Sequence, residues 1–139
     1  VVRKMNSIPV RRGEADRRSI ALAIAALVEG GGLVLFPEGT RSKSGAFLEP
    51  KLGVGMIAAR AERPVVPVYI AGTQGNLPRT VLSALVRRRK IHVIYGEPVM
   101  LTSEADSRNG RYRDMVAQVM ERIAALRDEL NEMIEAGAA

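Results

Sequence analysis

The sequence predicts a single α/β domain in which helices pack on the faces of a mixed β-sheet. Three observations support this fold class. The chain has 139 residues, of which 47% are hydrophobic and 26% charged, the size and balance of one globular domain. Short apolar segments alternate with segments whose apolar residues recur at helical spacing. A long amphipathic segment near the C-terminus is expected to close the sheet, and no repeat or linker divides residues 1–139.

The first expected helix lies within "ADRRSIALAIAALVEGGG", residues 15–32. Asp16 stands near its start, where a carboxylate can accept free backbone amides, and the glycines at 30–32 end it. Its apolar face is formed by residues at helical spacing: Ile20, Ile24, Leu27 and Val28. The next segment, Leu33–Phe36, is wholly apolar and predicts a strand in a sheet that is covered on both faces.

The same alternation continues to the C-terminus. The segment "GVGMIAARAERP" predicts a second helix that Pro64 terminates, followed by a strand at Val65–Ile70. A third strand is expected at Lys90–Tyr95, after one or two helical turns at Val81–Val86. A long amphipathic helix from about Arg111 to Ile134 should dock on the sheet through apolar residues spaced three or four apart: Tyr112, Met115, Val119, Ile123, Leu126, Leu130 and Met133.

Charge is distributed unevenly along the chain. The net charge is +6, but residues 121–139 hold two basic and five acidic groups, which leaves 19 basic and 10 acidic groups, about +9, in the first 120 residues. Such a surplus favours phosphate-bearing partners: anionic small molecules, acidic lipid surfaces or nucleic acid. Aromatic residues make up only 4%, which counts against single-stranded nucleic acid because its binding usually needs stacking platforms.

Several classes of protein are disfavoured by composition. The longest apolar run, Ile20–Val28, is far shorter than the roughly 20 residues of a membrane-spanning helix. The absence of cysteine excludes a disulfide framework, a thiolate metal site and a thiol nucleophile.

The first residue, Val1, is not an initiator methionine and no leader-like segment precedes the first helix, so we expect the chain to begin inside a longer protein.

Polar groups gather directly after the expected strand at Leu33–Phe36, in the turn "FPEGTRS". Sites in open α/β sheets form where strands end, and Pro37 ends strand pairing. Gly39 permits tight backbone geometry, while Thr40 supplies a hydroxyl beside the Arg41 guanidinium, a group suited to bidentate phosphate binding. Glu38 is expected to orient Arg41 or another cation. The alternative is a solvated surface turn with one Glu-Arg pair.

The turn "FPEGTRS" resembles the third sequence block of the glycerophospholipid acyltransferase family, which includes the 1-acylglycerol-3-phosphate acyltransferases. "SIPVRRG", residues 7–13, resembles the second block, and "VVPVYIAG", residues 65–72, resembles the fourth. "EPKLGVG" and "VIYGEPV" also follow in the family's order. The resemblance covers nearly the whole chain before the last helix and implies a glycerol-3-phosphate acyltransferase-like fold.

The resemblance implies roles for individual residues. It assigns the acceptor phosphate site to Arg12, Glu38, Gly39, Thr40 and Arg41, with Arg12 and Arg41 as the anchors, and Lys51 as a further candidate. Arg11 stands where the family more often has an acidic or neutral residue. An acyl or acyl-donor channel would be shaped by Val66, Pro67 and Val68, although apolar strand residues also form ordinary core.

The family's first block, His-x-x-x-x-Asp, is absent from the chain. In the family this block supplies the base that removes a proton from the acceptor hydroxyl. Because it would precede residue 7 by several tens of residues, we expect an N-terminal truncation that removed the catalytic pair and left an inactive fragment. The only histidine, His92, lies in an expected strand and has no aspartate five residues on, which favours a structural role.

Other basic residues invite weaker hypotheses. The run "RRRK", residues 87–90, could contact anionic lipid headgroups, but a solvated strand flank is the commoner explanation. Arg17 and Arg18 begin a helix, where cations oppose the helix dipole, and are candidates for a basic rim.

The leading hypothesis is transfer of a fatty acyl group from acyl-CoA or acyl carrier protein to a lysophospholipid, most simply 1-acylglycerol-3-phosphate. No metal or cofactor is expected, because the thioester is already activated. The expected location is the cytoplasmic face of a membrane, peripheral or anchored through upstream residues, with an anionic lipid surface as partner. The alternative is a non-catalytic phosphate-binding or anionic-lipid-binding module. Nucleic-acid binding rests on charge alone and is not expected.

Overall fold

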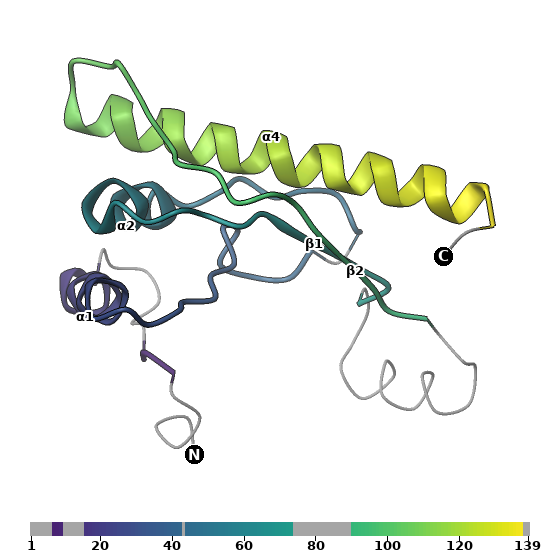
Figure 1. Cartoon of the computed structure of the whole chain (residues 1–139), viewed down its shortest axis with the longest axis horizontal. Coiled ribbons are helices and arrows are strands. Elements are labelled where there is room, and N and C mark those ends of the chain that lie inside the picture. The colour runs from purple at the N-terminus through teal and green to yellow at the C-terminus, as the bar shows by residue number, and fades with distance from the viewer. Residues whose placement is uncertain (1–6, 10–15, 43, 74–89, 138–139) are drawn as a thin grey trace.

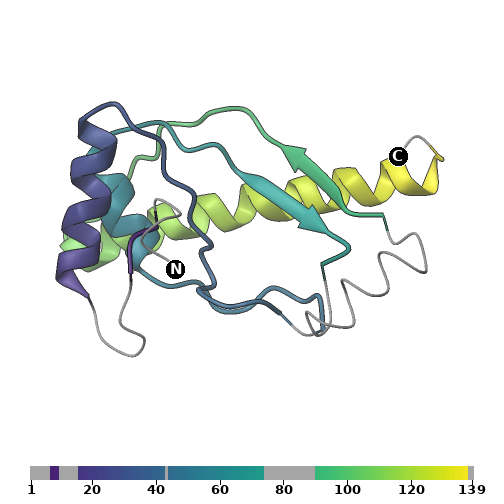
Figure 2. The same ribbon diagram turned by 90° about the horizontal axis from the view of Figure 1, so that it is seen from below.

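A computed structural model describes residues 7–9, 16–42, 44–73 and 90–137. Its helices and strands are, in chain order, α1 (Arg17–Val28), α2 (Gly53–Ala61), β1 (Val68–Ala71), β2 (His92–Tyr95) and α4 (Arg108–Glu135). The long helix α4 runs along one side of the molecule (Figure 1). The helices α1 and α2 lie together near its N-terminal end, and the two strands lie farther along it (Figure 2).

The first predicted helix is confirmed as α1, with Asp16 as its N-cap. The Asp16 carboxylate accepts a hydrogen bond from the backbone amide of Ser19 at 3.2 Å, as capping requires. The fully buried positions of α1 are the small residues Ser19 and Ala23, which let the helix pack closely. The predicted apolar face is only partly correct, because Ile20 is half-buried and Val28, at the end of the helix, is exposed.

The long amphipathic helix is confirmed as α4 and supplies most of the core. Ser107 caps it by accepting a hydrogen bond from the Gly110 amide at 3.0 Å, so the helix begins three residues earlier than predicted. Its buried positions repeat at helical spacing: Tyr112, Met115, Val116, Val119, Ile123, Leu126 and Leu130. Met133, predicted on the same face, is exposed because the last turns of α4 extend beyond the elements that cover it.

The helices α2 and α4 approach most closely at Gly55. A Cβ atom at this position would overlap the backbone carbonyl of Tyr112. Only glycine therefore allows the two helices to cross at this distance. The second predicted helix is confirmed by α2, although it ends at Ala61, three residues before Pro64.

The sheet is smaller than predicted. In the described part of the chain it consists of β1 and β2 alone, paired antiparallel with Val68 opposite Tyr95 and Ala71 opposite His92. A single bridge between Val65 and Val99 continues this pairing toward α2. The predicted strands at Val65–Ile70 and Lys90–Tyr95 are confirmed in their C-terminal parts, and the chain contains both helices and strands as expected. The expected helical turns at Val81–Val86 lie outside the described residues.

The strand predicted at Leu33–Phe36 is wrong. These residues form no regular strand, and the side chains of Val34 and Phe36 are 84% and 68% exposed. The apolar character of the segment favours a strand, but a strand forms only when a neighbouring strand accepts and donates its backbone hydrogen bonds. No strand among the described residues lies against this segment.

One face of the sheet is covered and the other is open in the described part of the molecule. The covered face carries Ile94 and, two residues on, Gly96, at which a Cβ would lie 3.4 Å from Leu126 of α4. On the opposite face Tyr95 is 70% exposed, and Ile70 and Val93 beside it are also exposed. The expectation of a sheet covered on both faces is therefore not met within these residues.

Candidate functional site

The turn after Phe36 opens a loop, residues 37–51, that is closed by two hydrogen bonds. The backbone amide of Lys51 donates to the carbonyl of Pro37 at 2.8 Å, and the amide of Leu48 donates to the Glu38 carboxylate at 2.9 Å. The Gly39 amide donates to the Phe36 carbonyl at 3.0 Å, which makes the turn tight. Gly39 has a φ of 68°, in the left-handed region that glycine adopts without strain.

Serine hydroxyls shape the far end of the 37–51 loop. The hydroxyl of Ser42 accepts a hydrogen bond from the Gly45 amide at 3.0 Å, and that of Ser44 accepts one from the Ala46 amide at 3.3 Å. These bonds satisfy backbone amides that have no partner in regular structure. Ser42 therefore helps to hold the loop in shape.

An aromatic contact fixes the loop to the rest of the fold. The ring of Phe47 meets Tyr69 of β1 edge to face, with centroids 6.1 Å apart, and the guanidinium of Arg127 from α4 lies 5.0 Å from the Phe47 centroid. Arg127 also pairs with Asp128 at 2.8 Å, and this hydrogen bond raises the pKa of the Arg127 guanidinium. The loop is thus held between the sheet and α4.

The structure brings two predicted site residues together across the 37–51 loop. A Cβ at Gly39 would lie 3.6 Å from Cγ of Lys51, so the Lys51 stem passes directly beside the turn although it is twelve residues away in sequence. Thr40 and Arg41 are exposed on the same turn. Within the described residues, the Arg41 guanidinium has no hydrogen bond or ion pair.

Glu38 does not have the partner that the sequence suggested. Its carboxylate was expected to orient Arg41, or to form the one ion pair of a plain surface turn. It accepts the Leu48 amide instead, and among the described residues the ion pair is that of Arg127 with Asp128. A carboxylate fits here because the backbone amide ten residues on needs an acceptor where the loop closes.

Arg12, the second predicted anchor, lies outside the described residues, as does Arg11. The described segment before it, residues 7–9, is tied to α1, because the Ser19 hydroxyl donates to the Pro9 carbonyl at 2.7 Å. The part of the second sequence block that can be placed therefore lies against the first helix. The role of Arg12 stays a prediction.

Comparison with known proteins identifies the family. The acyltransferase family model matches residues 1–71, just over half of the chain. The chain belongs to the acyltransferase family. It is 32% identical over 120 residues to the chloroplastic 1-acyl-sn-glycerol-3-phosphate acyltransferase BAT2 of Brassica napus, and 31% identical over 121 residues to the chloroplastic LPAT1 enzyme of Arabidopsis thaliana. Each alignment covers 84% of the chain.

A bacterial relative aligns over more of the chain. The 1-acyl-sn-glycerol-3-phosphate acyltransferase of Bacillus subtilis is 29% identical over 134 residues, which is 96% of the chain and 58% of that enzyme. The chain spans about a third of the length of the two plant relatives. No solved structure matches the chain at a significant level.

The three predicted channel residues lie on different sides of the sheet. Val66 and Val68 alternate with Pro67, so they lie on the open apolar face, where Val66 is exposed and Val68 half-buried. Pro67 is buried, and its Cγ would be 2.8 Å from a Cβ at Gly96. The channel assignment stays a prediction for all three residues, with Val66 and Val68 on the accessible side.

His92 occupies a structural position. It pairs with Ala71 in the sheet, is half-buried on the α4 face, and has no acidic partner among the described residues.

No group of three or more potential metal-ligating side chains occurs in the described ranges. Of the helices described, none combines the length and apolar character that crossing a bilayer requires. Of the basic run at 87–90, only Lys90 is described, and it is exposed.

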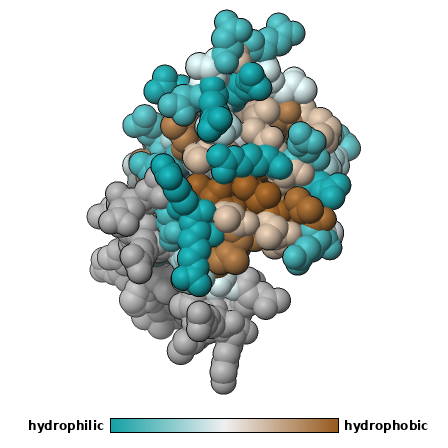
Figure 3. Space-filling model, turned by 90° about the vertical axis from the view of Figure 1, so that its left-hand side faces the viewer, coloured by the Kyte–Doolittle hydropathy of each residue, from teal (hydrophilic) through white to brown (hydrophobic). Residues whose placement is uncertain are grey.

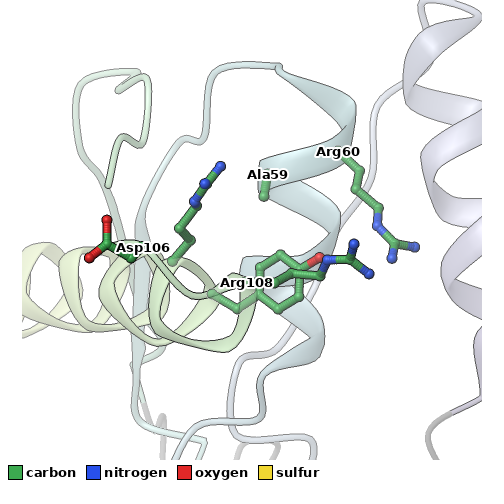
Figure 4. A pocket seen from close by; sticks show the side chains of 6 residues that line it. Ala59, Arg60, Asp106 and Arg108 are labelled. Atoms are coloured by element: carbon green, nitrogen blue, oxygen red, sulfur yellow. The ribbon is translucent and has the colours of Figure 1, made fainter. Parts of the chain in front are cut away.

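Sequence reasoning identified one residue of a second basic region, Arg17, as a candidate for a basic rim, and missed the others. Arg60, Arg108 and Arg111 line hollows between α2 and the start of α4 (Figure 4). They belong to elements far apart in the chain, so no motif joins them. The one signal available was the position of Arg108 and Arg111 at the start of a helix without an acidic residue in its first turn.

Proposed function

We propose that the chain is the acceptor-binding part of an O-acyltransferase that forms phospholipids. The reaction would move a fatty acyl group from acyl-CoA or acyl carrier protein to a lysophospholipid, most simply 1-acylglycerol-3-phosphate. The observation that carries the proposal is the closed 37–51 loop. It carries Arg41, whose guanidinium has no hydrogen bond or ion pair among the described residues, on the turn that the Lys51 stem passes at Gly39, in a chain of the acyltransferase family.

The loop suits a phosphate monoester for chemical reasons. A guanidinium donates two parallel hydrogen bonds to phosphate oxygens, and an ammonium adds a compact charge. Arg41 would supply the first and Lys51 the second, while the Thr40 hydroxyl can donate a further hydrogen bond. The Glu38 carboxylate accepts a hydrogen bond from the Leu48 amide, where the loop closes. Its negative charge would therefore act on this amide rather than on the ligand.

Holding the phosphate would fix the acceptor hydroxyl for reaction. The hydroxyl oxygen attacks the thioester carbonyl, a carbon-oxygen bond forms, and the carbon-sulfur bond breaks to release the thiol of the carrier. A general base takes the hydroxyl proton and passes it to the leaving thiolate. The family resemblance places this base in a His-x-x-x-x-Asp block, and neither a metal nor a cofactor is part of the proposed step.

Residues 1–139 would act at a membrane and carry out only the binding part of the reaction. The acceptor is a membrane lipid, which supports action at the cytoplasmic face of a membrane. Residues 1–139 alone should bind the acceptor without catalysing transfer, since His92 has no acidic partner in the described part of the structure. Arg12 would complete the phosphate site beside Arg41.

Acyl transfer by the full-length protein tests the proposal. Thiol release from acyl-CoA, and from acyl carrier protein, is measured with 1-acylglycerol-3-phosphate as acceptor. Thiol release that depends on the acceptor, lost in Arg41→Ala and retained in Arg122→Ala on the far part of α4, is the expected result. The alternative, a non-catalytic phosphate-binding module, gains support from the isolated position of His92. Phosphate-dependent binding without any thiol release from either donor would favour that alternative and refute the enzyme.

A further inference from the structure

A basic hollow lies where α1, α2 and the start of α4 meet. It consists of two adjoining cavities of about 450 and 390 Å³ that share Arg60, Arg108 and Tyr112. Four arginines from the three helices line it: Arg17, Arg60, Arg108 and Arg111. We refer to these cavities together as the basic hollow. It is separate from the 37–51 loop, because no residue of that loop lines either cavity.

Three of the four arginines of the basic hollow lack a polar partner among the described residues. Arg17, Arg60 and Arg108 have no hydrogen bond or ion pair in the part of the chain that the structure describes. Figure 4 shows the guanidinium groups of Arg60 and Arg108 extending in the same direction, toward α1, whereas the Asp106 carboxylate lies on the opposite side of the view. The one acidic residue of the lining therefore does not stand between these two cations.

Arg111 is held at the edge of the same hollow. Its Nε donates a hydrogen bond to the Ala105 carbonyl at 3.0 Å, which leaves the terminal guanidinium nitrogens available. A guanidinium is a planar cation with several hydrogen-bond donors and no acceptor. Four such groups around one hollow favour an anionic occupant.

The dipole of α4 adds to the positive potential. Arg108 is the first residue of α4, which has no acidic residue in its first turn and is capped by the neutral hydroxyl of Ser107. The N-terminal end of a helix carries a partial positive charge, which makes a cation unfavourable there and an anion favourable. At α1 the Asp16 carboxylate caps the helix beside Arg17 and offsets this charge, so the dipole argument rests on α4 alone. Proteins break local rules of this kind at functional sites.

The shape of the basic hollow suits a ligand with a polar head. Its combined size falls in the range of small-molecule sites. The buried ring of Tyr112 and the half-buried side chains of Met56 and Ile20 line it between the arginines. The face of the molecule on which α1 and α2 lie shows hydrophobic side chains crossed and bordered by hydrophilic ones (Figure 3).

We propose that the basic hollow binds a phosphate group, as an anion site additional to the one assigned to the 37–51 loop. Phosphate is the anion that planar guanidinium groups from several elements grip best, through paired hydrogen bonds. The phosphate can come from two sources with the same chemistry. One is the headgroup of an anionic phospholipid at a bilayer surface, and the other is a soluble phosphate ester.

The test compares two variants of the whole chain. Arg60→Ala/Arg108→Ala removes the two cations shared by both cavities. Arg113→Ala/Arg122→Ala removes two exposed cations of α4 that do not line the hollow, with the same change of net charge. Circular dichroism establishes that both variants keep their helices. Sedimentation with vesicles of phosphatidylglycerol and phosphatidylcholine measures the lipid source, and calorimetry with adenosine 3′,5′-bisphosphate measures the soluble source.

The expected result is binding of at least one probe, weakened at least tenfold by Arg60→Ala/Arg108→Ala and less than threefold by the control. Loss of vesicle binding alone would assign the phosphate to a lipid, and loss of bisphosphate binding alone to a soluble ester. Equal losses in both variants would show nonspecific attraction and overturn the proposal, as would the absence of binding to both probes. Arg41→Ala is expected to leave this binding unchanged, so the result is independent of the function proposed for the 37–51 loop.

Discussion

The carboxylate of Glu38 accepts a hydrogen bond from the backbone amide of Leu48 at 2.9 Å, across ten residues of chain. This bond and the one between Lys51 and Pro37 hold both ends of the 37–51 loop. A charged residue in the middle of the "FPEGTRS" turn thus has a structural use. It helps to set the shape of the turn on which Arg41 stands.

Replacement of Glu38 should loosen this loop selectively. Glu38→Ala leaves the Leu48 amide without its acceptor, and a hydrogen bond of this kind contributes about 1 kcal/mol. The expected results are faster hydrogen exchange at Leu48 and a decrease of about that size in the free energy of unfolding. Glu38→Gln keeps an acceptor oxygen and should retain most of the protection. Unchanged exchange at Leu48 in Glu38→Ala would show that the bond does not close the loop.

The crossing of α2 and α4 should depend on one glycine. Gly55→Ala forces a methyl group against the Tyr112 backbone, where the existing carbonyl carbon is 2.9 Å from the Cβ position, and should lower the free energy of unfolding by about 3 kcal/mol. Gly53→Ala, two residues earlier in the same helix, meets no atom within 4 Å and should be neutral or stabilise by up to about 1 kcal/mol. Urea denaturation distinguishes them, and similar effects of both substitutions would contradict this crossing.

The exposed position of the segment at Leu33–Phe36 can be tested in the same way. Val34→Ala should change the free energy of unfolding of residues 1–139 by less than about 0.5 kcal/mol, because its side chain is 84% exposed. Val119→Ala, at a residue only 3% exposed in the core face of α4, should cost about 2 kcal/mol. A comparable loss in Val34→Ala would mean that the segment is buried as the sequence suggested.

The helices could be predicted from sequence because their signals are local. Asp16 caps α1 through an amide three residues away, and the apolar spacing from Tyr112 to Leu130 defines the buried face of α4. Both features depend on neighbours within a few turns. The wrong strand at Leu33–Phe36 has the opposite cause, since strand formation depends on partners that the segment itself does not specify.

Only the contiguous part of the candidate site could be predicted from sequence. The "FPEGTRS" turn is contiguous, so its residues were found together. The partner of Glu38 is a backbone amide, which has no sequence signature, and the Glu38-Arg41 pair suggested by their short separation was wrong. The basic hollow is lined by Arg17, Arg60 and Arg108. Arg17 and Arg60, and likewise Arg60 and Arg108, are more than forty residues apart in sequence, so only the packing of three helices places them together.

The most direct test of the account is the affinity of residues 1–139 for a soluble, short-chain 1-acylglycerol-3-phosphate, measured by calorimetry with and without Arg41. Arg41→Ala should raise the Kd at least tenfold, with Arg41→Lys in between, because the lost charged hydrogen bonds are worth about 1.5–3 kcal/mol. The corresponding monoacylglycerol, which lacks the phosphate, should bind weakly and equally to all forms. An unchanged Kd for the phosphorylated acceptor in Arg41→Ala would contradict the central claim that this turn holds the phosphate.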